Sequence, residues 1–341
     1  MCRNKWIIVP LFLILLFLAG CGEKDAKTLV NDLSKRSEKM ESYISHGKLT
    51  IQTGQEPQIV DVEVWYKKPH YYRVALKNPK KDITQILLRN DEGVYVLTPS
   101  LKKSYRFQSD WPESSGQIYL YQSILGSIID DQKRQFQREK GTYLFEVAAK
   151  FTLNQNWKKQ KVWLDQKLNP KKVSVFNDKD EVMVEMVFDR FQLDPSFDKD
   201  AFDMKRNLSQ MTEESKQTLA GLKQKMDKRG MASLAPMYIP MGSQLDGEKT
   251  VQTIAGPAVI MRYTGSKPFT ITQKKPQEIE TFLSEQAKPV MLYQGFGVLL
   301  NQDKQKQLKW LDGQREFELT GALSEEEMIK IANSFADQVE K

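Results

Sequence analysis

The chain has 341 residues, 28% of them charged, and a formal net charge of +7 at pH 7. This length is sufficient for one large or two moderate hydrophobic cores. The basic surplus is spread along the chain without long basic blocks, which argues against nucleic acid as a partner. Because both cysteines, Cys2 and Cys21, lie near the N-terminus, the rest of the chain offers no thiol for disulfides, thiolate catalysis or metal binding.

The N-terminus has the pattern of an export signal. Arg3 and Lys5 precede an apolar run over residues 6–18, and the small residues Ala19 and Gly20 follow it. A membrane-spanning helix needs about 20 apolar residues, and this run is shorter. We therefore expect residues 1–20 to be a signal peptide rather than a spanning helix.

The segment Leu18-Ala19-Gly20-Cys21 resembles the bacterial lipobox. The resemblance implies that the Cys21 thiol receives diacylglycerol, that the chain is cut before it, and that fatty acids such as palmitate anchor the mature protein. Residues 21–26 would then be a lipidated tether on the extracytoplasmic face of the cell membrane. The alternative is a plain secretory signal with an incidental cysteine. Removing Arg3 and Lys5 lowers the net charge to +5, and this surplus suits an anionic membrane surface.

Residues 27–203 have the pattern of one domain rich in strands. Leu29, Leu33, Met40 and Ile44 recur at helical spacing, and Asp25 can cap a helix that starts there. Beyond them, apolar residues alternate with polar ones, as in half-buried strands. We predict an antiparallel meander with strands over residues 49–51, 60–66, 71–76, 83–89, 94–98 and 104–107, and then 143–153, 162–164, 173–175 and 182–188.

A hydrophobic segment interrupts this meander at residues 114–131. It is apolar around most of a helix, at Ile118, Leu120, Tyr121, Ile124, Leu125, Ile128 and Ile129. A helix that is apolar on several faces must be covered by other parts of the protein. It is either an ordinary core helix or a lid over an apolar cavity that admits acyl chains.

The order of these elements resembles that of the LolA-like lipoprotein-carrier superfamily, which also includes RseB-type sensors of envelope stress. The resemblance extends to the closing segment, Phe188-Asp189-Arg190-Phe191-Gln192-Leu193-Asp194-Pro195-Ser196-Phe197, and to Phe202 after it. The whole chain is similar to sporulation-associated membrane lipoproteins of Gram-positive spore-formers. The resemblance implies a mainly β or α+β fold, an unclosed antiparallel half-barrel that wraps helices around a hydrophobic cavity. A chain anchored at Cys21 would hold, sense or hand over a ligand at one membrane rather than shuttle.

The C-terminal third has the pattern of a second domain. Residues 204–230 are polar and predict a helical linker, and residues 231–341 predict a smaller α+β domain. Within this domain we expect a short helix around Ile279, Phe282 and Leu283 and a tight turn at 294–297. The sequence Ser324-Glu325-Glu326-Glu327 predicts a capping box at the start of the last helix.

The chain offers little for catalysis. His46 and His70 are its only histidines, and the sequence contains no zinc-protease, nucleophile-elbow, phosphate-loop or dinucleotide motif. We therefore expect a protein that is not an enzyme and that has neither a cofactor nor a metal site.

Two functional hypotheses follow from these patterns. In the first, the protein binds acyl chains of a lipid or lipoprotein in the cavity of the half-barrel. In the alternative, it is an envelope sensor or interaction module that docks on a membrane regulatory protein through residues 231–341. Trp65 lies on the opposite strand face from the valines and is the candidate for an exposed contact. The candidates for lining the cavity are Val62, Val64, Leu87, Ile124, Ile128, Phe145, Val147 and Val184.

Overall fold

A computed structural model describes residues 25–53, 56–108, 111, 117–149, 157–209, 233–254, 256–277, 280–282, 287–302, 304–312 and 315–335. The predicted signal peptide, Cys21 and most of the predicted linker lie outside these residues. Within the described part of the chain, no helix is both long enough and apolar enough to cross a membrane. Residues up to Lys39 and residues from Met40 onward form two separate compact units.

The first unit contains one described helix, α2 (Ala26–Lys39). The Asp25 carboxylate accepts a hydrogen bond from the Thr28 backbone N–H at 2.8 Å, and the Asp25 carbonyl accepts one from Leu29 at 3.0 Å. The predicted cap is therefore confirmed. The helix ends at Lys39, so Met40 and Ile44 do not continue it, and Ile44 instead lies in the first strand.

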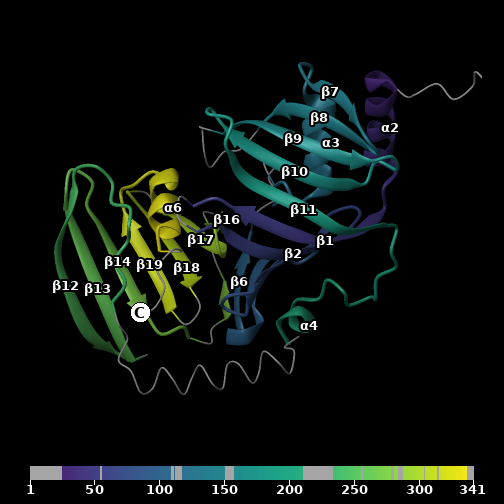
Figure 1. The fold of residues 1–341 in the computed structure, drawn as a ribbon. Coiled ribbons are helices and arrows are strands. Elements are labelled where there is room, and N and C mark those ends of the chain that lie inside the picture. The colour runs from purple at the N-terminus through teal and green to yellow at the C-terminus, as the bar shows by residue number, and fades with distance from the viewer. Residues whose placement is uncertain are drawn as a thin grey trace, which may run out of the picture. The chain divides into compact units, whose positions relative to one another are not determined.

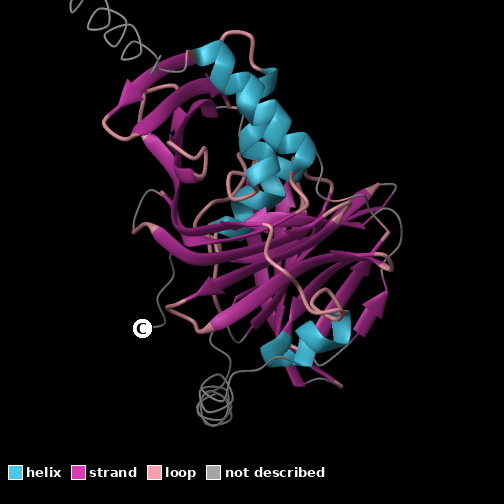
Figure 2. Ribbon diagram, turned by 90° about the vertical axis from the view of Figure 1, so that its right-hand side faces the viewer, coloured by secondary structure: helices cyan, strands magenta, loops and turns pink. Residues whose placement is uncertain are grey.

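The second unit begins with a 12-stranded sheet in the order β15-β6-β5-β4-β3-β2-β1-β11-β10-β9-β8-β7 (Figure 1). All of its pairs are antiparallel except β15 with β6, and its two edge strands, β15 and β7, do not meet. Strands dominate the structure, and few helices accompany them (Figure 2). The predicted fold class, an unclosed antiparallel half-barrel with a smaller second domain, is confirmed. Its strands are β1 (Ser42–Ile51), β2 (Gln58–Lys67), β3 (Tyr71–Asn78), β4 (Ile83–Asn90), β5 (Gly93–Thr98), β6 (Lys103–Phe107), β7 (Gln135–Glu139), β8 (Thr142–Ala148), β9 (Trp157–Asp165), β10 (Pro170–Asn177), β11 (Val182–Leu193) and β15 (Glu280–Phe282).

Alternation along these strands gives the sheet two faces, because successive side chains point to opposite sides. We call the face that carries Tyr43 of β1, Val64 of β2 and Val74 of β3 the inner face. Val64 is directly paired with Val74, and Tyr43 is paired with Tyr66, which lies two residues from Val64 and so on the same face. Helix α3 (Tyr121–Asp130) lies against this face, and its Tyr121, Ile124, Leu125 and Ile128 are buried. The hydrophobic segment at 114–131 is thus a covered helix, shorter than predicted.

The opposite, outer face of β3–β5 is partly covered by the chain that follows β11. Ala201 and Phe202 pack against Ala75, Ile86 and Leu88 in one buried cluster. Helix α4 (Met204–Ser209) continues this cover through Met204 and Leu208. The first residues of the predicted linker therefore pack on the first domain. A short 3-10 helix, η2 (Pro99–Leu101), joins β5 to β6.

The C-terminal domain is a seven-stranded antiparallel sheet in the order β12-β13-β14-β19-β18-β17-β16, with α6 (Glu325–Asn333) packed on one face. The predicted capping box is confirmed, since Ser324 Oγ accepts from the Glu327 N–H and the Glu327 carboxylate accepts from the Ser324 N–H. The predicted turn at 294–297 is also confirmed, between β16 and β17. The strands are β12 (Ser243–Thr253), β13 (Gly256–Gly265), β14 (Phe269–Lys274), β16 (Ala287–Leu292), β17 (Gly295–Gln302), β18 (Gln305–Asp312) and β19 (Arg315–Gly321).

One element of this domain differs from its prediction. The short helix expected around Ile279, Phe282 and Leu283 is wrong at Phe282, because Glu280–Phe282 is strand β15, while Ile279 and Leu283 lie outside the described residues. This strand leaves its own domain and pairs in parallel with Ser104–Arg106 of β6. A short apolar segment such as this one is compatible with a helix or a strand. It forms a strand here because β6, which is far away in the sequence, pairs with it.

Candidate functional site

Helix α3 is held on the inner face by side chains that lie far from it in the sequence. Its N-cap residue, Leu120, makes no side-chain capping bond. Instead, the Tyr43 hydroxyl accepts from the Tyr121 N–H at 3.1 Å and donates to Gln122 Oε1 at 3.0 Å. The Tyr121 hydroxyl in turn donates to the Leu168 carbonyl at 2.6 Å. Burial raises the pKa of Tyr43 well above its usual value, so this hydroxyl stays protonated.

The eight candidate cavity residues are all buried. Six of them lie on the inner face of the sheet, and the other two, Ile124 and Ile128, lie on α3. The most exposed of the eight is Val184, at 6%. None of these side chains is therefore open to solvent in this arrangement. A ligand could reach them only if the helix or the sheet moved, and their role in ligand binding stays a prediction.

The outer face of the half-barrel carries an open cleft of about 610 Å³. Val62, Ala75, Ile86 and Pro99 are its apolar lining, and charged side chains surround them. Val62 is thus the one candidate cavity residue that also lines this cleft. This volume lies within the range of typical ligand sites, roughly 300–1,000 Å³. We call this feature the outer cleft. The residues that line it are His46, Gly47, Asp61, Val62, Glu63, Arg73, Ala75, Lys77, Asp82, Thr84, Ile86, Pro99, Ser100 and Asp189.

Charges of both signs meet in the outer cleft. Lys77 Nζ lies 3.0 Å from Asp82 Oδ1, and Arg73 forms an ion pair with Glu63. Arg73 is only 7% exposed, and its Nε also donates to Asn207 Oδ1 of α4 at 2.6 Å. Burial lowers the pKa of Arg73, while the neighbouring Glu63 opposes that shift. Arg73 therefore fixes one wall of the cleft.

The cleft wall on β1 and β11 is less constrained. His46 Nε2 lies 3.5 Å from Glu63 Oε2, and Lys48, next along the same face, pairs with Asp61 at 2.6 Å. The hydrogen bond from Lys48 to Asp61 is the main cause of the raised Lys48 pKa, and the charge of Asp189 adds to it. Asp189 itself is exposed. A ligand can therefore reach these groups from solvent.

Trp65 differs from its prediction in exposure. It does lie on the face opposite Val62 and Val64, but it is half-buried. The Arg73 guanidinium lies 4.4 Å from its ring centre, and the Phe197 ring packs on it at 5.7 Å. The returning chain after β11 therefore covers Trp65, so it is a packing residue at the edge of the outer cleft rather than an exposed contact.

The two histidines occupy different places. His46 lies in the outer cleft, whereas His70 stacks on Tyr71 and its Nε2 lies 3.0 Å from Asp91 Oδ1. A hydrogen bond from Tyr71, followed by one from His70, lowers the pKa of Asp91. Among the described residues, no group of three or more His, Cys, Asp or Glu side chains is placed to hold a metal ion.

A buried polar contact joins the two sheets. Lys103 Nζ of β6 lies 2.7 Å from Glu316 Oε2 of β19, and their side chains are 3% and 7% exposed. Tyr105 donates a longer hydrogen bond of 3.4 Å to the same carboxylate. Burial lowers the pKa of Lys103, and Glu316 opposes the shift by favouring the ammonium form. We call this group of three residues the inter-sheet lock.

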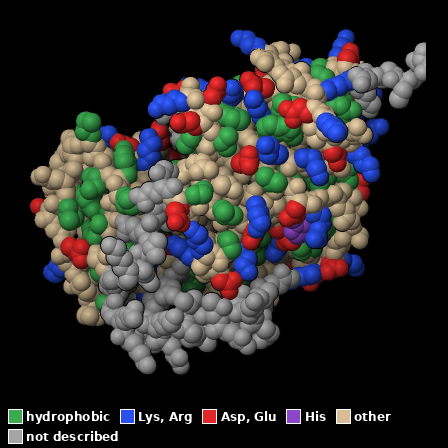
Figure 3. All heavy atoms as spheres, viewed as in Figure 1, with side chains coloured by type: hydrophobic (Ala, Val, Ile, Leu, Met, Phe, Trp, Pro, Cys, Tyr) green, Lys and Arg blue, Asp and Glu red, His purple; other side chains and the backbone are tan. Residues whose placement is uncertain are grey.

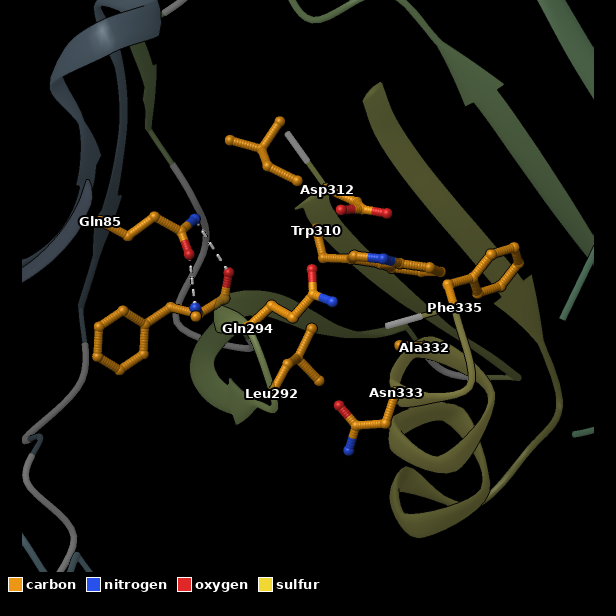
Figure 4. Close-up of a pocket in the computed structure, with 11 residues that line it drawn as sticks. Gln85, Leu292, Gln294, Trp310, Asp312, Ala332, Asn333 and Phe335 are labelled. Atoms are coloured by element: carbon orange, nitrogen blue, oxygen red, sulfur yellow. Dashed lines mark hydrogen bonds between the residues drawn. The ribbon is translucent and has the colours of Figure 1, made fainter. Parts of the chain in front are cut away.

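Gln85 makes a second inter-sheet contact, shown in Figure 4. Its amide oxygen accepts from the Phe296 N–H at 2.7 Å, and its nitrogen donates to the Phe296 carbonyl at 3.3 Å. Gly295 has a φ of +152°, which other residues rarely adopt, and a Cβ there would also displace the Gln85 amide. The adjoining pocket has a volume of about 20 Å³, room for about one water molecule and not for a larger ligand.

Sequence reasoning missed both the outer cleft and the inter-sheet lock. Part of the signal for the cleft was present, because Asp61, Glu63 and Trp65 alternate with valines on β2. That alternation shows a polar face but does not show that Arg73, Asp82 and Asp189 close around it. The lock joins residues 213 positions apart, and the strand pattern gives no sign of such a pairing.

Sequence comparisons show that this chain is similar to sporulation proteins. Residues 3–202 match the family described as "Sporulation protein YdcC-like", and residues 233–335 match a domain of unknown function, DUF4367. The chain is 37% identical over 333 residues to "Sporulation protein YdcC" of Bacillus subtilis (strain 168), which covers 96% of each chain.

Comparisons with solved structures found more distant likenesses. The MucA/MucB complex of Pseudomonas aeruginosa matches with 13% identity and a TM-score of 0.32, over 91% of this chain and 98% of that chain. A LolA superfamily protein from Nitrosomonas europaea, NE2245, matches with 13% identity and a TM-score of 0.29, over 54% of this chain and 100% of that chain.

Proposed function

The chain belongs to the sporulation protein YdcC-like family, and from that premise we propose that it is a membrane-tethered, extracytoplasmic binding protein that takes a polypeptide partner into the outer cleft. The observation that carries this proposal is the cleft itself, an open space of about 610 Å³ on a sheet whose inner-face candidate residues are all buried. The protein acts by binding and not by catalysis.

The lining of the outer cleft favours a polypeptide over a lipid chain. Four carboxylates, two cationic side chains and His46 surround a small apolar floor. Acyl chains gain nothing from such groups, whereas a polypeptide offers charged side chains and backbone hydrogen bonds to pair with them. The buried Arg73 gives the cleft a rigid wall, which reduces the entropy cost of binding.

Site-specific cross-linking tests this proposal. A photoreactive amino acid replaces Thr84 inside the cleft, and a control variant carries it at Asp178, in the exposed turn after β10. In sporulating cells we expect Thr84 to cross-link to an extracytoplasmic segment of a membrane protein. Charge reversal by Asp189→Lys should reduce that product severalfold. If Thr84 and Asp178 give the same background products, the cleft is not the binding site.

The tether is the second part of the proposal, and it rests on the lipobox-like segment around Cys21. Cys21→Ser should abolish labelling of the chain by radioactive palmitate and release the protein from the membrane fraction. A variant that stays fully membrane-bound and labelled would overturn the assignment of Cys21.

Acyl binding remains a second candidate function, and the apolar packing of α3 favours it. The helix packs on an apolar sheet face through apolar side chains, and the hydrogen bonds with Tyr43, Gln160 and Leu168 that hold it there join neutral groups. Movement of this helix alone would open space lined by Phe145 and Val147. Native mass spectrometry of the chain from Gly22, purified without detergent, should then show a bound acyl species that is lost in Ile128→Trp. An empty wild-type protein would leave only the outer cleft as a binding site.

A further inference from the structure

An unusual number of exposed apolar side chains gather at the start of the C-terminal domain. The described residues include nine large hydrophobic side chains that are exposed, and five of these nine lie within residues 237–245. We call these five the apolar tip. They are Met237 (57% exposed), Tyr238 (36%), Ile239 (40%), Met241 (93%) and Leu245 (48%). Residues 234–245 contain no charged side chain, although 28% of the whole chain is charged.

The structure holds this segment in place from both ends. At its start, the buried Gln273 side chain accepts from the Leu234 N–H at 3.0 Å and donates to the Leu234 carbonyl at 2.5 Å. At its end, the Gly242 carbonyl accepts from the Ser266 N–H at 2.9 Å, and the Ser243 hydroxyl donates to the Lys267 carbonyl at 2.7 Å. The tip is therefore fixed to the β13–β14 turn.

Two prolines decide which side chains face outward. Pro236 and Pro240 are buried, while Met237, Ile239 and Met241 between and beside them are exposed. Proline restricts the backbone and thereby lowers the entropy cost of holding this arrangement. The segment thus presents apolar side chains to solvent although polar residues there would cost less, and such surfaces mark interaction sites.

We propose that the apolar tip is a second membrane contact, which inserts Met241 and its neighbours into the interface of an anionic lipid bilayer. This inference rests on the proposed tethering, which would keep the domain close to a membrane. The net charge of +5 that remains without Arg3 and Lys5 supports an anionic surface, and the Tyr238 ring, with its apolar body and polar end, suits the headgroup region.

The shape of the tip favours lipid over a protein partner. Met241 protrudes with 93% of its surface exposed, so a protein partner would need a matching pocket to bury it. A fluid acyl layer can surround a protruding side chain without a matching pocket. In Figure 3, hydrophobic side chains also reach the surface over β12 and β13, the strands next to this segment.

Vesicle sedimentation tests the proposal with the chain that starts at Gly22, which has no anchor and contains every described residue. The probe is a vesicle of phosphatidylglycerol and phosphatidylethanolamine. We expect the affinity of the double variant Ile239→Ser/Met241→Ser for these vesicles to be lower than that of the unchanged chain by about fivefold or more. The control is Ile59→Ser/Val187→Ser, which removes two exposed apolar side chains, 41% and 43% exposed, from β2 and β11 and should bind normally.

A second measurement reports on insertion directly. In Met241→Trp, vesicles should shift the tryptophan emission to shorter wavelength, while Ile59→Trp should show no shift. Equal sedimentation of the two double variants would overturn the proposal. Failure to bind vesicles, together with self-association that Ile239→Ser/Met241→Ser abolishes, would instead assign the tip to a second copy of the chain. Asp189→Lys adds positive charge away from the tip and should not weaken vesicle binding, so failure of the outer cleft and failure of the tip can be told apart.

Discussion

Helices α3 and α6 each cover an apolar sheet face, but they are fixed in different ways. The sequence around α6 supplies its own cap, since Ser324 and Glu327 satisfy each other's backbone groups. The N-terminus of α3 has no such side chain and depends on Tyr43, 78 residues away. A helix that is capped locally keeps its capping groups when its tertiary contacts loosen, whereas one that is capped from the sheet loses its cap when it leaves.

This difference matters for the proposed functions. If α3 lifts from the inner face, its first turn loses the bond to Tyr43 and an apolar space opens beneath it. Movement of α6 would expose the apolar core of its domain and leave its capping box intact. Of the two helices, α3 is therefore the one suited to movement in response to a ligand, and four predictions test this contrast.

The largest effect should come from the inter-sheet lock, which joins the two helix-covered sheets. Lys103→Met leaves the Glu316 carboxylate buried without its cation and should lower the free energy of unfolding by about 3–5 kcal/mol. The double variant Lys103→Met/Glu316→Leu should recover most of this loss. Urea denaturation measures both variants. A single variant that costs less than about 1 kcal/mol would mean that the sheets do not depend on the lock.

Packing substitutions compare the two helices directly. Ile128 of α3 and Ile331 of α6 are both 0% exposed, so replacing either with Ala should lower the free energy of unfolding by about 2–5 kcal/mol. Ile129→Ala is the matched control, because this neighbouring side chain is only partly buried and should cost less. If Ile128→Ala costs no more than Ile129→Ala in urea denaturation, α3 does not pack as described.

Loss of either capping contact should lower the free energy of unfolding by less, and each loss should affect a different helix. Tyr43→Phe removes the oxygen that binds Tyr121 and Gln122 and should cost about 1–3 kcal/mol. Ser324→Ala should cost about 0.5–2 kcal/mol. Hydrogen exchange locates each loss: Tyr43→Phe should speed exchange in α3 and leave α6 unchanged, and Ser324→Ala should do the reverse. The same exchange pattern in both variants would refute the contrast between the helices.

The two helices also show what the sequence alone can reveal. The start of α6 was predicted correctly because its cap lies within four consecutive residues. The helix predicted over 114–131 begins at Tyr121, where the capping group comes from Tyr43 on a distant strand. Period-two alternation, which is also a local pattern, predicts strands such as β2 and β8. Strand β15 and the outer cleft depend on residues that meet only in the folded chain, and no local pattern encodes such meetings.

The smallest expected effect is a difference between α6 and α3 in how their local stability responds to acid. A hydrogen bond from Lys267 is the main cause that lowers the pKa of Glu327 below its usual value of 4.5, and bonds from Ser324 add to it. A carboxyl whose pKa is lower in the folded protein stabilises it above pH 4.5, and this stability is lost as pH falls through the folded pKa. The raised pKa of Tyr43 acts at the other end, so the contact of α3 is lost only at strongly alkaline pH. Between pH 6 and pH 3, hydrogen exchange should therefore increase at the start of α6 relative to α3, after correction for the intrinsic effect of pH, and Glu327→Gln should remove most of this difference. An equal acid response of the two helices would show that the capping carboxylate does not set the stability of α6.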